Sequence, residues 1–289
     1  MKLARTALAL MLTLGLLPAP LAMAESFTPE LAYNRMVALH VLHALPTRPS
    51  LAVDVTRAEA VAVLVRAFGK ADEAALLERA PVFADTADHW ASGYIAEATK
   101  LVASAGGSLG LPGGNFAPNA RVTRAQAVAF LAKFLGVRPD PAKAWPANYL
   151  DAALAQGLIT ADEHALANRE PEAVMIRAEF FFIADRAFYT FDIGGGKTVY
   201  TKYWDSEAPT LTLEAVEPIA GTPSLTVRGR VTGAVTLTAN GEPVLIAADG
   251  SFTYGFTPPE GASGWNLDFV AQDLAGNVTE KSVSRTRTQ

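Results

Sequence analysis

The chain contains no cysteine among its 289 residues. This absence excludes disulfide scaffolds, thiol nucleophiles and thiolate metal sites together. Basic residues are too scattered to favour nucleic-acid binding, with 24 Lys and Arg against 29 Asp and Glu and no basic run. Half of the residues are hydrophobic, so packed cores rather than covalent cross-links must hold the fold together.

Residues suited to catalysis are sparse. Neither cysteine nor a cluster of carboxylates completes a metal site around the four scattered histidines. No Ser–His–Asp spacing is evident, and the glycine-rich stretch before Lys197 is not a phosphate loop because Phe191 replaces its first glycine. A carboxylate pair for sugar hydrolysis depends on spatial rather than sequence spacing, so that alternative stays open. We predict that the protein is not an enzyme and uses no cofactor or metal.

Long apolar runs are missing, with one exception at the amino terminus. Lys2 and Arg5 precede an apolar run over residues 7–17, and the small residues of the stretch 22–24 resemble a cleavage site. This pattern predicts a secretory signal peptide over residues 1–24. The alternative of a membrane anchor is disfavoured because the run is too short to span a bilayer comfortably. Losing two of the 24 basic residues leaves 22 against 29 acidic ones, a net charge of −7.

A short helical pattern occurs three times. In the most complete copy, Thr123 takes the N-cap position, Gln126 follows three residues later as a capping box requires, and Gly136 supplies the stop. The pattern also begins at Val55 and, with isoleucine replacing the capping threonine, at Met175. The arginines that open these helices are 67 and 53 residues apart, too irregular for a long solenoid and typical of three copies of one unit. They are Arg57, Arg124 and Arg177.

The second unit also shows what precedes this helix. Asp85 or Asp88 is expected to cap a first helix that carries Trp90 in its first turn. A glycine- and proline-rich loop follows over residues 106–118. The unit is therefore predicted as a helix, a long loop and a capped helix.

The other two units depart from this pattern. The third repeats the aromatic spacing from Trp145, and its loop is expected to begin at Gly157. The first offers a helix over residues 31–45, but it has no tryptophan and its loop is short and free of glycine.

Together these residues resemble the surface-layer homology (SLH) family. The resemblance is carried by the motifs Phe83-x-Asp85, His89-Trp90-Ala91, Tyr94-Ile95, Gly113-Gly114-Asn115-Phe116-x-Pro118 and Val122-Thr123-Arg124-Ala125. It covers residues 25–190, with repeats over roughly 26–70, 81–137 and 138–190, the first degenerate. It implies a pseudo-threefold helical domain with grooves between repeats, which binds a cell-wall polysaccharide that typically carries pyruvate ketals.

The residues themselves supply a physical reason for such binding. An arginine at the first helical position opposes the helix dipole, so three of them are unusual for structure alone. A helix N-terminus offers unpaired N–H groups to an anion, a guanidinium matches a carboxylate, and a tryptophan offers a flat face to a sugar ring. The predicted ligand-binding residues are Arg57, Arg124, Arg177, Trp90, Trp145, Asp85, Thr123, Glu59 and Glu179.

Each candidate has a structural alternative. Thr123 and Glu59 are explained as parts of capping boxes, the tryptophans as core aromatics, and the arginines as members of surface ion pairs. Asp85 serves equally well as a helix cap or as an acceptor from a sugar hydroxyl. We expect one or two competent grooves, around Arg124 and Arg177, with the degenerate repeat contributing packing.

A linker is predicted over residues 191–207. Its glycines predict a flexible joint, and residues 199–204 alternate like a strand.

From residue 208 to 289 the hydrophobic period changes to two. About seven short strands, one of them over residues 243–247, are separated by turn signals such as Asn240-Gly241 and predict a β-sandwich. The stretches 249–252 and 273–277 resemble immunoglobulin-like modules of exported bacterial proteins. A tight turn explains the polar residues of 273–277 better than a calcium site does.

The predicted fold class is therefore multidomain α plus all-β, with three SLH repeats before an immunoglobulin-like sandwich. The predicted function is non-covalent anchoring of a secreted protein to the bacterial cell wall or surface layer. The partners are a wall polysaccharide, suspected to be pyruvylated, and envelope proteins that contact the sandwich. Two alternatives remain: a structural envelope protein whose helical half binds another protein, and a non-catalytic subunit of a wall-active enzyme complex.

Overall fold

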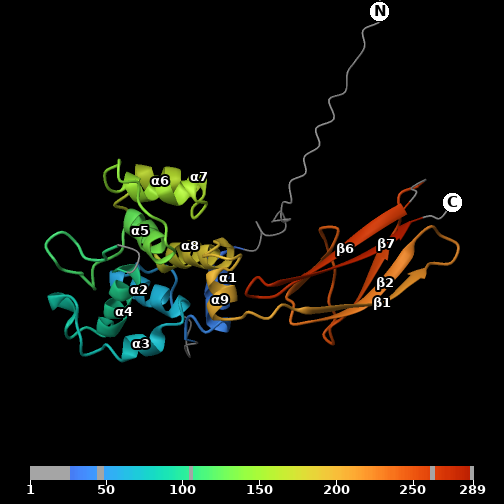
Figure 1. Cartoon of the computed structure of the whole chain (residues 1–289), viewed down its shortest axis with the longest axis horizontal. Coiled ribbons are helices and arrows are strands. Elements are labelled where there is room, and N and C mark those ends of the chain that lie inside the picture. Colours follow the sequence, from blue (N-terminus) through green and yellow to red (C-terminus); the bar gives the residue numbers. More distant parts are fainter. Residues whose placement is uncertain (1–26, 44–48, 104–106, 261–263, 287–289) are drawn as a thin grey trace, which may run out of the picture.

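The computed structural model describes residues 27–43, 49–103, 107–260 and 264–286. The predicted signal peptide, residues 1–24, lies outside these ranges. The described chain forms a helical half followed by a β half, and the two lie end to end along the long axis of the molecule (Figure 1). Among the described residues, no helix is both long enough and apolar enough to cross a membrane.

The helical half is built around three central helices, each of which opens with one of the repeated arginines. These are α2 (Arg57–Ala67), α5 (Arg124–Phe134) and α8 (Arg177–Thr190). The capping boxes predicted for α2 and α5 are confirmed, because the Thr56 and Thr123 hydroxyls accept from the backbone N–H three residues later and the return bond is also made. In α8, Ile176 has no side-chain acceptor, and only the bond from its N–H to Glu179 Oε2, 3.2 Å, remains.

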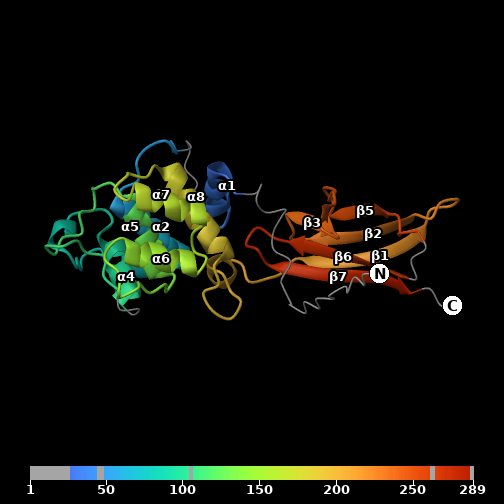
Figure 2. The ribbon, with the colours of Figure 1, turned by 90° about the horizontal axis from the view of Figure 1, so that it is seen from above.

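Further helices surround these three (Figure 2). They are α1 (Pro29–Ala38), α3 (Ala71–Ala75), α4 (Ser92–Ala103), α6 (Ala147–Ala155), α7 (Ala161–Arg169) and α9 (Val199–Tyr203), with a 3-10 turn at Ala84–Thr86. Three expectations are wrong here. The helix α1 ends well before residue 45, α4 begins after Trp90 rather than before it, and the loop expected after Gly157 contains α7.

A closed ring of backbone hydrogen bonds joins the three units. The N–H of Val55 donates to Met175 O (3.0 Å), that of Met175 to Val122 O (3.0 Å), and that of Val122 to Val55 O (2.9 Å). These residues lie just before α2, α5 and α8. The ring therefore gathers the N-terminal ends of all three central helices at one place.

The β half consists of two antiparallel sheets that share one hydrophobic core. One sheet has the order β1-β2-β5 and the other β4-β3-β6-β7. Residues from both sheets, including Leu211, Val227, Leu237, Phe252 and Phe269, form the core. The strands are β1 (Thr210–Pro218), β2 (Leu225–Thr232), β3 (Thr236–Ala239), β4 (Glu242–Pro243), β5 (Ser251–Phe256), β6 (Gly264–Gln272) and β7 (Val278–Thr286).

Most of the predicted strands are present, but the one expected over residues 243–247 is shorter. The strand β4 comprises Glu242 and Pro243, and beyond it Val244 N–H still donates to Leu237 O of β3 at 2.8 Å. The tight turn predicted at 273–277 is confirmed, because Asp273 Oδ1 accepts from the N–H groups of Gly276 (2.7 Å) and Asn277 (2.8 Å).

The segment that follows the glycines of the joint, residues 199–204, is not the strand that its alternation predicts. Residues Val199–Tyr203 form the helix α9, capped by Thr198, and pack on the helical core. Trp204 then donates its indole N–H to Ala67 O at 2.8 Å. Tertiary packing therefore outweighs the local period-two pattern in this segment.

Candidate functional site

The three repeated arginines form a cyclic set of side-chain contacts around the hydrogen-bond ring. Arg57 Nη1 donates to Gln126 Oε1 (3.1 Å), Arg124 Nη2 donates to Glu179 Oε1 (3.3 Å), and Arg177 Nη2 donates to Glu59 Oε1. Each acceptor is the third residue of the central helix in the next unit. Glu59 also caps its own helix, because its other oxygen accepts from Thr56 N–H at 2.9 Å.

The first of these arginines is buried. Arg57 is only 2% exposed, and its Nε and Nη2 donate to Phe116 O (2.8 Å) and Leu109 O (2.9 Å). The guanidinium also lies 4.9 Å and 5.0 Å from the ring centres of Phe116 and Phe130. Desolvation by burial lowers the pKa of Arg57 to about 10. These contacts assign Arg57 a packing role, and it offers no free face to a ligand from solvent.

The other two arginines remain accessible. The side chains of Arg124 and Arg177 are 14% and 26% exposed, and each has a single carboxylate partner. The third unit has α7 in place of a long loop of the kind whose carbonyls accept hydrogen bonds from Arg57 in the second unit. Within the described part of the chain, Arg124 Nε is consequently buried without a hydrogen-bond partner.

The helix N-termini themselves are not open anion sites, contrary to the expectation from the sequence. The N–H groups of Arg57, Arg124 and Arg177 donate to Ala120 O (2.9 Å), Ala173 O (2.8 Å) and Val53 O (2.8 Å), and the next N–H in each helix is also paired. The hydroxyl of Thr123 caps Gln126 N–H at 3.4 Å. The helix N-termini are occupied because the ring of backbone hydrogen bonds places the chain of the next unit against the start of each central helix.

Both candidate tryptophans are on the surface. Trp90 is 57% exposed and Trp145 is 47% exposed, so the alternative of core aromatics does not describe them. Each contacts the tyrosine four residues later edge to face, with ring centres 6.3 Å apart for Tyr94 and 6.1 Å apart for Tyr149. Each pair therefore presents an indole face that a sugar ring could cover.

A cationic side chain from the preceding unit lies over the ring of each tyrosine. The sequence did not lead us to expect these two cations. Arg66 Cζ lies 4.8 Å from the centre of the Tyr94 ring, and Lys133 Nζ lies 5.1 Å from that of Tyr149. Desolvation lowers the pKa of Lys133 to about 8. Arg66 and Lys133 both stand nine residues after the opening arginine of their helices. Comparing the repeats position by position would have found them.

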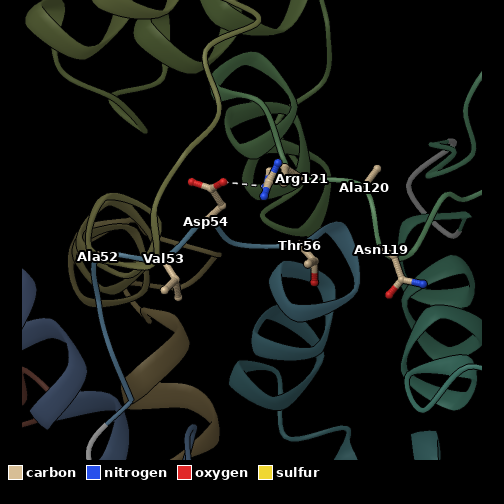
Figure 3. Close-up of a pocket in the computed structure, with 7 residues that line it drawn as sticks. All are labelled: Ala52, Val53, Asp54, Thr56, Asn119, Ala120 and Arg121. Carbon is tan, nitrogen blue, oxygen red and sulfur yellow. Dashed lines mark ion pairs between the residues drawn. The ribbon is translucent and has the colours of Figure 1, made fainter.

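Trp90 is connected through His89 and Asn119 to a polar hollow between the first two units. The rings of Trp90 and His89 are 5.5 Å apart, and His89 Nε2 lies 3.1 Å from Asn119 Oδ1. Asn119 and Thr56 line a hollow of about 860 Å³, whose other lining residues are Ala52, Val53, Asp54, Ala120 and Arg121 (Figure 3).

An exposed ion pair lies across this hollow. Arg121 Nε is 2.6 Å from Asp54 Oδ2, and the Arg121 side chain is largely exposed. Figure 3 shows these two side chains pointing toward each other, with Thr56 and Asn119 on the Arg121 side. Hydroxyl, amide, carboxylate and guanidinium groups are thus combined at the end of an aromatic surface, an arrangement suited to a polar sugar.

Asp85 neither caps a helix nor remains free. Its oxygens accept from the N–H groups of Phe116 (3.0 Å) and Ala117 (2.6 Å). Desolvation acts to raise the pKa of Asp85, but these N–H donors and the charge of Arg57 lower it below its usual value. Asp85 therefore fastens the loop whose carbonyls hold Arg57.

Two comparisons show which known proteins this chain is similar to. Residues 82–128 match the S-layer homology domain family. A "Cell surface protein" of Thermoanaerobacter kivui is 34% identical over 160 residues, which are 54% of this chain and 19% of the relative. The matched region is thus about a fifth of that relative's length. Residues 82–128 are thus similar to an S-layer homology domain, and both similarities support anchoring at the cell envelope.

Proposed function

We propose that this protein is a non-catalytic anchor that attaches to cell-wall polysaccharide through three SLH-type repeats. The observation that carries the proposal is the surface exposure of Trp90 and Trp145, in a helical half that also carries the partly exposed guanidinium groups of Arg124 and Arg177. The cyclic hydrogen bonds of residues 53–58, 120–125 and 173–178 support a pseudo-threefold arrangement of the repeats. The two sheets around one core support an immunoglobulin-like β half that serves as a spacer or a partner-binding surface.

In this proposal a carboxylate-bearing sugar, such as a pyruvylated one, contacts both kinds of group. Its ring covers the face of Trp90 or Trp145, and its carboxylate receives a bidentate hydrogen bond from a guanidinium. At the junctions closed by Arg124 and Arg177, the incoming carboxylate competes with Glu179 and Glu59 for these donors.

The junction between the first two units uses a different cation. Because Arg57 is buried, the guanidinium that faces solvent there is Arg121, at the end of the surface that begins at Trp90. This assignment adds Arg121, Asn119 and Thr56 to the proposed contact residues.

The test is binding of the purified protein to purified cell-wall sacculi, before and after mild acid removal of the polysaccharide. Removing one indole face costs about 1–1.5 kcal/mol, so Trp90→Ala should weaken binding about tenfold, and Trp145→Ala should do the same at its own junction. The double variant Arg124→Ala, Arg177→Ala should reduce binding further.

A matched control is Arg228→Ala, which removes an exposed, ion-paired arginine of the β half. It should bind sacculi like the parent protein. Undiminished binding after acid treatment and in both sets of variants would refute polysaccharide recognition and favour a protein partner.

A further inference from the structure

The turn between β6 and β7, residues 273–277, is inserted into the helical half. Ala275 is fully buried within the hydrophobic cluster of that half, and Leu274 packs against the same cluster. Gly276 has a φ of +98°, and a Cβ placed on it would lie 3.2 Å from Cζ of Tyr189. The turn fits against the tyrosine ring because position 276 has no side chain.

Polar contacts fasten this turn to the segment that joins the halves. Asn277 Nδ2 donates to Asp205 O and to Asp273 Oδ2, both at 2.8 Å. Just beyond the turn, the Thr279 hydroxyl donates to Pro209 O at 2.5 Å. The turn is thus bonded to the chain on the carboxyl side of α9 as well as packed on α8.

Tyr189 connects the turn to a buried polar network. Arg35 Cζ lies 4.4 Å from the centre of the Tyr189 ring, and its Nη1 is 2.6 Å from Asp185 Oδ2. The other oxygen of Asp185 accepts from the Tyr200 hydroxyl at 2.7 Å. Arg35 belongs to α1, Asp185 to α8 and Tyr200 to α9, so one continuous set of contacts joins the turn to three helices.

The helix α1 cannot be stable without contacts of this kind. It has 10 residues, too few for an isolated helix to be stable in water, so its order must come from packing. The packing comes from α8 and its neighbours, through Tyr33 on Phe181 and Phe27 on Tyr189. Figure 1 shows α1 and α9 at the end of the helical half that faces the strands.

We propose that the β half acts as an intramolecular clasp, in which the β6–β7 turn holds α1 and α9 against α8 and so secures the junction between the first and third helical units. The β half is then a structural part of the anchor rather than an independent module tethered to it. The clasp is a property of the fold and does not depend on which ligand the helical half binds.

The experiment compares two glycine variants of the full chain by amide hydrogen–deuterium exchange. Gly276→Val forces a branched side chain into the left-handed region and against Tyr189. Gly241→Val imposes similar backbone strain at a φ of +85° in the β3–β4 hairpin, where nothing lies within 4 Å. Gly276→Val should speed exchange in α1 and α9 about tenfold or more, while Gly241→Val should leave both helices unchanged.

Two further outcomes are decisive. If Gly276→Val speeds exchange only within the turn, or if both variants affect α1 equally, the clasp is refuted. Should Gly276→Val fail to fold, Asn277→Ala removes the bonds to Asp205 and Asp273 without new bulk, and the same pattern is expected more weakly. Trp145→Ala separates this proposal from the proposed function, because this exposed side chain lies away from α1 and α8, so the variant should reduce sacculus binding while exchange in α1 stays at the parent rate.

Discussion

Replacing Arg57 by alanine is the sharpest test of how the repeated arginines divide between packing and binding. The substitution removes three donors at once, those that bond Phe116 O, Leu109 O and Gln126 Oε1. It also empties the space between the Phe116 and Phe130 rings. Two carbonyls of the second unit's loop are left buried and unpaired.

The expected cost is large. Each buried carbonyl left without its donor costs about 1–3 kcal/mol, so the two carbonyls together with the lost side-chain packing should cost about 3–5 kcal/mol. At about 2–4 °C per kcal/mol for a domain of this size, the Tm of the helical half should fall by roughly 6–20 °C. Arg57→Lys keeps the charge, but a single ammonium cannot span three acceptors, so it should recover only part of the loss.

Thermal unfolding followed by circular dichroism of the helices measures this effect. Arg177→Ala is the matched control, since it removes the equivalent arginine from a partly exposed ion pair, which is worth about 0–1 kcal/mol. The reasoning fails if Arg57→Ala keeps the Tm of the parent protein. It fails equally if Arg57→Ala loses sacculus binding with no loss of stability, because Arg57 would then be a ligand contact.

Two further predictions concern buried or loop-fastening carboxylates. Burial raises the pKa of Asp185 from 3.8 to about 6, despite the lowering effects of Arg35 and Tyr200. The folded state therefore holds this proton more tightly than the unfolded state, and the parent should gain up to about 3 kcal/mol over Asp185→Asn as the pH falls from about 6 to about 4. Urea unfolding of both proteins across this range measures the gain, and parallel pH profiles would contradict it. Asp85→Ala should cost about 1–2 kcal/mol and speed exchange of the Phe116 and Ala117 amides, which the carboxylate now holds. Unchanged exchange at those two amides would disprove the role given to Asp85.

The local features of this fold could be predicted because their causes lie within a few residues. Thr56 and Thr123 start helices through bonds that reach three residues along the chain, and both were found from spacing alone. A missed helix had the same signal. Thr160 and Glu163 form a capping box at the start of α7, so the sequence contained the information that the expected loop is helical.

The different roles of the three arginines could not be predicted from the motif. Arg57 and Arg124 open helices with the same local sequence, Thr-Arg-Ala, yet one is enclosed and the other accessible. The difference is set by the next unit, which supplies carbonyls of the long loop in one case and α7 in the other. The occupied helix N-termini have the same non-local origin, since the carbonyls that accept from Arg57, Arg124 and Arg177 lie 63, 49 and 124 residues away in the sequence.

The ring formed by Val55, Val122 and Met175 also sets the order in which the anchor can mature. Met175 takes part in two of its three hydrogen bonds and lies 120 residues after Val55. A chain that emerges amino terminus first can therefore form only the bond between Val122 and Val55 until Met175 is free, and closing so long a separation is slow. The ion pairs of Arg124 with Glu179 and of Arg177 with Glu59 likewise cannot form until α8 has been synthesised. The residues of the proposed binding surface can therefore come together only late in synthesis, after most of the helical half has been made.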